Sequence, residues 1–246
     1  MAIYALGWGL VAGSSALIGA LVGWFLRPAP RLIAMLLGLA SGILLSIATI
    51  ELFGEAFAHG NFPSAAMGFL AGAGLFAAGL AWLDRRGAKR RRRSSEAIVS
   101  ARDAAGIVAL ATVVDGIPEA LIIGINFHAG IGLGIATVLA VFLSNIPESL
   151  FYTTRMRAAG RSATYVASVW VAVTLATGIA SLAGYYVLGE LSPEGVAILQ
   201  AMVGGALLVF IADVIIPETS TETLDLTGLA MATGFLAGYS LSRFLG

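Results

Sequence analysis

The chain has 246 residues, of which 59% are hydrophobic and only 11% are charged, and its mean hydropathy is +0.93. Soluble domains carry about 25% charged residues, so this composition excludes a soluble globular protein. The formal net charge is zero, and the absence of cysteine excludes a disulfide framework, a thiolate metal site and a cysteine nucleophile.

Eight apolar runs are each long enough to cross the hydrocarbon core as a helix, which takes about 20 residues. In chain order they cover residues 4–26, 32–53, 64–83, 104–126, 131–154, 163–188, 195–216 and 226–245. The sequence therefore predicts an all-α polytopic membrane protein that forms a single transmembrane domain over residues 1–246. The first run lacks a basic start and a cleavage site, so we expect a retained helix and not a signal peptide.

Basic residues predict the orientation, because cytoplasmic loops of membrane proteins carry an excess of Lys and Arg. Thirteen of the fourteen basic residues follow the first, third or fifth run, on one side of the predicted membrane, and only Arg243 lies on the other side. We therefore expect these loops in the cytoplasm and both termini outside the cell membrane. The segment 84–103 is predicted as a basic cytoplasmic loop that touches anionic lipid headgroups and binds no nucleic acid.

Pairs of glycines four residues apart recur in these runs, a spacing that lets helix backbones approach closely in lipid. We interpret them as packing positions without a function of their own. The pairs are Gly9/Gly13, Gly19/Gly23, Gly38/Gly42, Gly68/Gly72 and Gly234/Gly238.

Two similar motifs interrupt the fourth and fifth runs, Asp115-Gly-Ile-Pro-Glu119 and Ser144-Asn-Ile-Pro-Glu148. Acids inside a membrane are costly and usually functional, and a proline leaves one backbone carbonyl without its helical donor. The four-residue spacing places both polar ends of each motif on one helix face. Because a short loop makes the two helices antiparallel, we expect these four end residues to form one cluster near mid-membrane, with Asn145 at its edge.

Three carboxylates cannot all stay ionised in lipid without a cation between them, so the cluster is expected to take up protons or to bind a metal ion. The alternative is a structural role, in which the prolines only kink the helices and the acids pair with hydroxyl groups. Further acids lie near helix ends, where an acidic mouth attracts cations. The entry or exit residues that we expect are Glu51, Glu55, Asp213, Glu218 and Glu222.

The two motifs resemble those of the Zrt/Irt-like (ZIP) family of metal transporters. That family has eight helices, both ends outside and a long cytoplasmic loop between helices 3 and 4. Its helix 4 carries His-Asn-x-Pro-Glu-Gly and its helix 5 a related Pro-Glu motif, and together they form a metal site near mid-membrane. The resemblance implies a ZIP-like bundle with helices 4 and 5 central, and uptake of a divalent metal toward the cytoplasm by alternating access.

The chain departs from the family pattern at the predicted site. Asp115 stands where the family has histidine, Gly116 where it has asparagine, and the sixth run has no acid to complete a second metal position. The ligands Asp115, Glu119, Ser144, Asn145 and Glu148 offer oxygen, which favours Mn²⁺, Fe²⁺ or Mg²⁺, whereas the resemblance favours Zn²⁺. We expect no tightly bound cofactor; the expected partners are the lipid bilayer, the transported metal ion and, as one option, a second copy in a homodimer.

Two other functions stay open. One is a proton-coupled carrier of a non-metal solute, which the missing histidine favours. The other is a non-transporting membrane protein that keeps a degenerate ZIP-like fold. An enzyme is not expected, because the chain lacks the His-Glu-x-x-His motif and neither histidine lies inside a predicted helix.

Overall fold

The computed structural model describes residues 2–54, 56–57, 61–93, 116, 119–127, 131–189, 191–220 and 224–245. These residues are helical apart from short connections and contain no β-strand, which confirms the all-α prediction. Two π-helical segments, η1 (Ile47–Gly54) and η2 (Ile211–Ile215), continue the helices before them, and residues 119–127 are also helical. The α-helices are α1 (Ala2–Phe25), α2 (Pro30–Ser46), α4 (Phe62–Arg93), α6 (Ile131–Ala158), α7 (Ala163–Gly189), α8 (Pro193–Phe210), α9 (Ile216–Ser220) and α10 (Leu224–Leu245).

Several of the described helices have the length and the apolar outer surface of membrane spans. Large apolar side chains face outward, among them Leu21 on α1, Leu70 on α4 and Leu236 on α10. Soluble monomers rarely expose extended apolar surface, whereas lipid covers such a surface readily. Five segments are long and apolar enough to cross a membrane: Ala2–Phe25, Pro30–Gly54, Phe62–Trp82, Ala163–Val187 and Pro193–Ile215.

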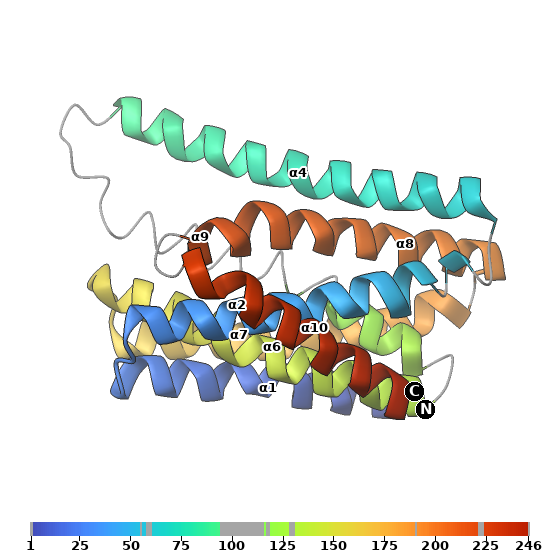
Figure 1. Ribbon diagram of the computed structural model, residues 1–246, viewed down its shortest axis with the longest axis horizontal. Helices are drawn as coiled ribbons and strands as arrows, with labels where there is room; N and C mark the ends of the chain where they lie inside the picture. The colour runs from blue at the N-terminus through green and yellow to red at the C-terminus, as the bar shows by residue number, and fades with distance from the viewer. Residues whose placement is uncertain are drawn as a thin grey trace.

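The helices pack largely in pairs, and α6 lies between the pair α1 with α7 and the pair α2 with α10 (Figure 1). The most extensive contacts join α1 with α6 and with α7, α4 with α8, and α2 with α10. Helix α6 contacts α1, α2, α7 and α10, so it touches helices from both sides of the bundle. Both chain ends lie at one end of the bundle, and the turn between α1 and α2 lies at the other end (Figure 1). This arrangement places the Pro-Glu motif of α6 deep among other helices.

Glycines make these helix pairs possible. A Cβ atom added to Gly72 of α4 would lie 1.8 Å from the carbonyl oxygen of Met202 in α8, and one added to Gly42 of α2 would lie 2.0 Å from the carbonyl oxygen of Met231 in α10. Every glycine of the five predicted pairs has an atom of another helix at 3.3 Å or less from this position. The interpretation of the pairs as packing positions is therefore confirmed.

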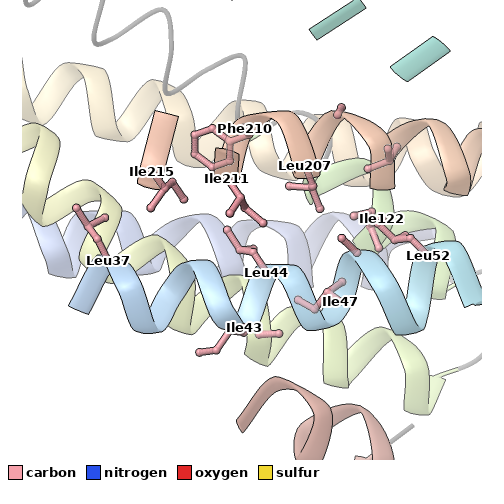
Figure 2. Packing of buried hydrophobic residues seen from close by; sticks show 14 of the residues in the cluster. Leu37, Ile43, Leu44, Ile47, Leu52, Ile122, Leu207, Phe210, Ile211 and Ile215 are labelled. Atoms are coloured by element: carbon pink, nitrogen blue, oxygen red, sulfur yellow. The ribbon is translucent and has the colours of Figure 1, made fainter. Parts of the chain in front are cut away.

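A buried apolar cluster fills the space between two long helical segments, one formed by α2 and η1 and the other by α8 and η2. Figure 2 shows Leu44, Ile47 and Leu52 packed toward Leu207 and Ile211. Since lipid tails are as apolar as these side chains, close van der Waals packing holds the helices together here, and the hydrophobic effect contributes little. The cluster therefore specifies how α2 and α8 fit against each other.

Three segments differ from the sequence predictions. The predicted loop 84–103 is helical up to Arg93, because the Lys, Arg and Ala residues after 83 are strong helix formers in water and α4 continues through them. The predicted helices 32–53 and 195–216 do not keep one helical geometry, since their last turns are the π-helical segments η1 and η2. Apolar periodicity does not distinguish a π-helical turn from an α-helical one, and π-helical turns are frequent at functional sites.

Candidate functional site

The second Pro-Glu motif lies inside α6, which continues unbroken through Pro147. Proline lacks an amide hydrogen, so it cannot donate to the carbonyl oxygen four residues earlier. The hydroxyl groups of the first residue of the motif and of the residue after it bond to the backbone of α6 itself. Ser144 Oγ donates to the carbonyl oxygen of Val141 at 3.1 Å, and Ser149 Oγ donates to that of Asn145 at 2.7 Å. The helix thus presents Glu148 from a rigid, internally bonded turn.

Glu119 stands at the start of the helical residues 119–127 and is buried, with 2% of its surface exposed. Neither of its carboxylate oxygens has a hydrogen-bond partner in the part of the chain that the structure describes. Burying a polar group without a partner costs several kcal/mol, about 2–7 for a neutral group and far more for an ion. Such a group is stable only when it holds a proton or contacts a cation.

Glu119 and Glu148 line the same cavity, which has a volume of about 20 Å³. Asn145 of α6 and Thr177 of α7 add polar groups to its wall. A space of this size holds about one water molecule or one dehydrated ion. The wall is completed by Ala16, Gly116, Ser149, Trp170 and Val173.

The cavity lies far from the ends of α1 and α7. Ala16 is well inside α1 and Thr177 is near the centre of α7, so several turns of helix separate the cavity from either end. The small side chain of Ala16 leaves room beside the carboxyl groups. In a membrane-spanning bundle this position is close to the midplane, where a charge is least tolerated.

Glu148 also borders a second cavity. This cavity has a volume of about 10 Å³ and is lined by residues of α2, α6, α8 and η2, among them Leu37, Phe210 and Ile215. Its other walls are Phe151, Tyr152 and Val214. Glu148 therefore lies between α1 and α7, which line the first cavity, and α2, α8 and η2, which line the second.

The structure places the other predicted ligands as follows. Asp115 lies outside the described residues, so its position relative to the cavity stays a prediction. Ser144 is buried but does not line the cavity. Among the described residues there is no group of three or more acids or histidines that would hold a metal ion. The polar residues of the described site are therefore Glu119, Glu148 and Asn145, together with the hydroxyl residues Ser149 and Thr177.

The predicted mouth residues fall in or beside the two π-helical segments. Glu51 is part of η1, and Asp213 is an exposed residue of η2. Glu218 belongs to α9, which follows η2 directly. Glu55 and Glu222 lie outside the described residues. A role of these acids in entry or exit stays a prediction.

Thr177 is a cavity residue that the sequence analysis missed. Thr174, Thr177 and Ser181 are polar residues spaced three and four apart in an otherwise apolar run, a pattern that marks one helix face. Thr174 Oγ1 donates to the carbonyl oxygen of Gly13 at 3.0 Å, and Ser181 Oγ donates to that of Ala5 at 2.8 Å, so both attach α7 to α1. Thr177 Oγ1 donates to the carbonyl oxygen of Val173 at 2.9 Å, within its own helix, and Thr177 lines the cavity.

Comparison with models of known protein families and with curated proteins finds no match to this sequence. The function is therefore inferred from the site itself.

Proposed function

We propose that the protein transports a divalent metal cation toward the cytoplasm, and that Glu119 and Glu148 bind the cation near the middle of the membrane. The observation that carries this proposal is the burial of Glu119 without any described hydrogen-bond partner, at a cavity that Glu148 also lines. A cation between the two carboxyl groups neutralises both, and it supplies the contacts that Glu119 lacks.

The size and chemistry of the cavity support a small, hard cation. Carboxylate, amide and hydroxyl oxygens are the ligands that Mn²⁺, Mg²⁺ and Fe²⁺ prefer, and the cavity wall contains no described nitrogen or sulfur ligand of the histidine or cysteine type. A volume of about 20 Å³ is far below the roughly 300–1,000 Å³ of pockets for organic molecules. This favours metal transport over the alternative of a carrier for a non-metal solute.

The directions of the helices support the proposal of eight spans in a ZIP-like order. Gly19 of α1 contacts Ser149 of α6, and Gly23, one turn later, contacts Thr153. Because the residue numbers increase in the same direction along both helices, α1 and α6 are parallel. Along α1 and α7 the residue numbers run in opposite directions, since Gly9 contacts Ser181 and Gly13 contacts Thr174, so these two helices are antiparallel. Spans one and five of an alternating chain must be parallel, and spans one and six antiparallel. With basic loops in the cytoplasm, both termini then lie outside.

Alternating access fits the position of Glu148 between two small cavities. One cavity lies toward α1 and α7, and the other toward α2, α8 and η2. A relative movement of these two sets of helices along α6 would widen one cavity as it narrows the other. The cation would then leave toward one side of the membrane after entering from the other.

Uptake into liposomes tests the proposed function. The purified protein is reconstituted, and uptake of Zn²⁺, Mn²⁺, Fe²⁺, Mg²⁺ and Cd²⁺ is measured against protein-free liposomes. We expect uptake of at least one of these ions, with Mn²⁺, Fe²⁺ or Mg²⁺ preferred because the described wall offers oxygen ligands. If the ions entered protein-free liposomes as fast as liposomes that contain the protein, metal transport would be contradicted.

The change Asp115→His tests the predicted contribution of Asp115 to selectivity. An imidazole nitrogen is a better ligand for Zn²⁺ than a carboxylate oxygen, whereas Mg²⁺ and Mn²⁺ prefer oxygen. We expect the ratio of Zn²⁺ uptake to Mn²⁺ uptake to rise by about tenfold, which corresponds to about 1.4 kcal/mol in relative binding. An unchanged ratio, measured in a competition assay with both ions, would remove Asp115 from the ligand set.

A further inference from the structure

A cleft of about 580 Å³ opens at the end of the bundle where α1 turns into α2 and where α6 ends. The turn contributes Arg27, α2 contributes Pro30 and Ile33, and α6 contributes Phe151, Arg155 and Arg157. The described residues that line the cleft include three arginines and no acid. Neither Glu119 nor Glu148 lines this cleft, although Phe151 lines both the cleft and the second cavity beside Glu148. The cleft opens at the end of the bundle that carries the predicted cytoplasmic loops.

Two of the arginines are held in place by aromatic neighbours. The guanidinium group of Arg157 donates a hydrogen bond to the carbonyl oxygen of Trp24 and lies 5.3 Å from the centre of the Trp24 ring. The guanidinium group of Arg155 lies 4.7 Å from the centre of the Phe151 ring. Each guanidinium has five N–H donors, so Arg157 keeps donors for a ligand after its bond to Trp24. Because these side chains are already held in place, they lose less conformational entropy when a ligand binds.

Arg27 has an unusual backbone for its residue type. Its φ angle is +51°, in the left-handed region, and it lies two residues after the last residue of α1. Glycine is the usual residue at this position of a helix end, because a side chain in the left-handed conformation costs about 1–2 kcal/mol. A glycine at this position would adopt the left-handed conformation without this cost. An arginine here places a cation at the cleft at the expense of local backbone energy.

We propose that this cleft binds a phosphate group, carried by an anionic lipid or by a soluble molecule. Arginine matches phosphate by paired hydrogen bonds, and basic pockets between membrane helices on the cytoplasmic side bind anionic headgroups. The apolar wall formed by Ile33, Ala34 and Phe151 suits the hydrocarbon part of a lipid. The volume lies within the range of roughly 300–1,000 Å³ that is usual for ligand pockets.

Native mass spectrometry of the purified protein tests this proposal with two ligand sources and three variants. The protein in detergent is titrated with phosphatidylglycerol, with phosphatidylcholine as the zwitterionic control, and with inorganic phosphate. The variants are Arg27→Gly, Arg157→Gln and the control Arg85→Gln, which removes an exposed arginine of α4 outside the cleft. Arg27→Gly suits the left-handed backbone and is expected to fold at least as stably as the wild type.

We expect phosphatidylglycerol to bind the wild type more tightly than phosphatidylcholine, and Arg27→Gly and Arg157→Gln each to weaken this binding by about tenfold or more. Arg85→Gln should bind as the wild type does. If inorganic phosphate binds and loses affinity in the same two variants, the site is a phosphate site with a soluble source. Two results would overturn the proposal: no binding of either ligand by the wild type, or equal binding by Arg27→Gly, Arg157→Gln and Arg85→Gln.

Discussion

Replacing Glu119 by glutamine is expected to abolish cation uptake into liposomes. Glutamine has nearly the same shape as glutamate, so the packing of residues 119–127 against α6 and α7 is kept. It lacks the negative charge that a divalent cation needs in a water-excluded cavity. We expect uptake to fall at least about a hundredfold, which corresponds to roughly 2.8 kcal/mol of lost binding. The measurement is initial uptake of the preferred ion from the screen described above.

Glu148→Gln should have the same effect, since both carboxyl groups line the one small cavity. The matched control is Glu194→Gln at the exposed start of α8. Glu194 accepts hydrogen bonds from Ser64 Oγ at 2.5 Å and from Asn61 Nδ2 at 3.2 Å, and a glutamine carbonyl can still accept both. Uptake by this control should match the wild type. Wild-type uptake by both Glu119→Gln and Glu148→Gln would show that the site is wrongly assigned.

Thermal stability separates lost binding from lost folding in these variants. A cation that binds only the folded protein raises its stability by about 2.7 kcal/mol at a hundred times the dissociation constant. The wild type should therefore melt at a higher temperature when the metal is added, and Glu119→Gln should not respond. Without metal, Glu119→Gln should be as stable as the wild type or more stable, because it removes a buried ionisable group that has no described partner.

Gly72→Ala is expected to have the largest effect on folding. A Cβ atom at this position would lie 1.8 Å from the carbonyl oxygen of Met202, and backbone atoms of α8 cannot move aside as a flexible side chain can. The helices α4 and α8 would have to separate along their whole contact. Overpacking of this kind costs about 1–3 kcal/mol or more. We expect a lower melting temperature and a smaller monodisperse peak in size-exclusion chromatography.

Gly74→Ala is the matched control, two residues further along α4. No atom lies within 4 Å of the position where its Cβ would stand. Alanine is a better helix former than glycine by about 1 kcal/mol in water, so this variant should be at least as stable as the wild type. Equal stability of the two variants would contradict the close contact between α4 and α8.

The sequence was sufficient to predict the helical fold and the packing role of the glycines. Apolar runs of about 20 residues have few alternatives to a helix in lipid, where every backbone group needs an internal partner. A glycine repeated at four-residue spacing marks the helix face that meets a neighbour. The extension of α4 to Arg93 was not predicted, because the hydropathy that marks a span says nothing about a helix that continues into water.

The candidate site could be predicted only in part. The two Pro-Glu motifs led to Glu119, Asn145 and Glu148, and the structure brings these three residues to one cavity. The contribution of Thr177 was missed, because a threonine in an apolar run more often bonds to its own helix, and only packing shows that it faces this cavity. The second cavity beside Glu148 depends on how α2 and α8 fit together, which no local pattern in the sequence specifies.

The most direct test of the account is to locate the cation. Crystals of the protein soaked in Mn²⁺ give an anomalous difference map in which the ion marks its own position. We predict a peak between the carboxyl groups of Glu119 and Glu148, with oxygen ligands at about 2.0–2.3 Å. The same peak should be absent from crystals of Glu119→Gln soaked in the same way. A wild-type map with no peak in this cavity, at a Mn²⁺ concentration that supports uptake, would contradict the proposed site.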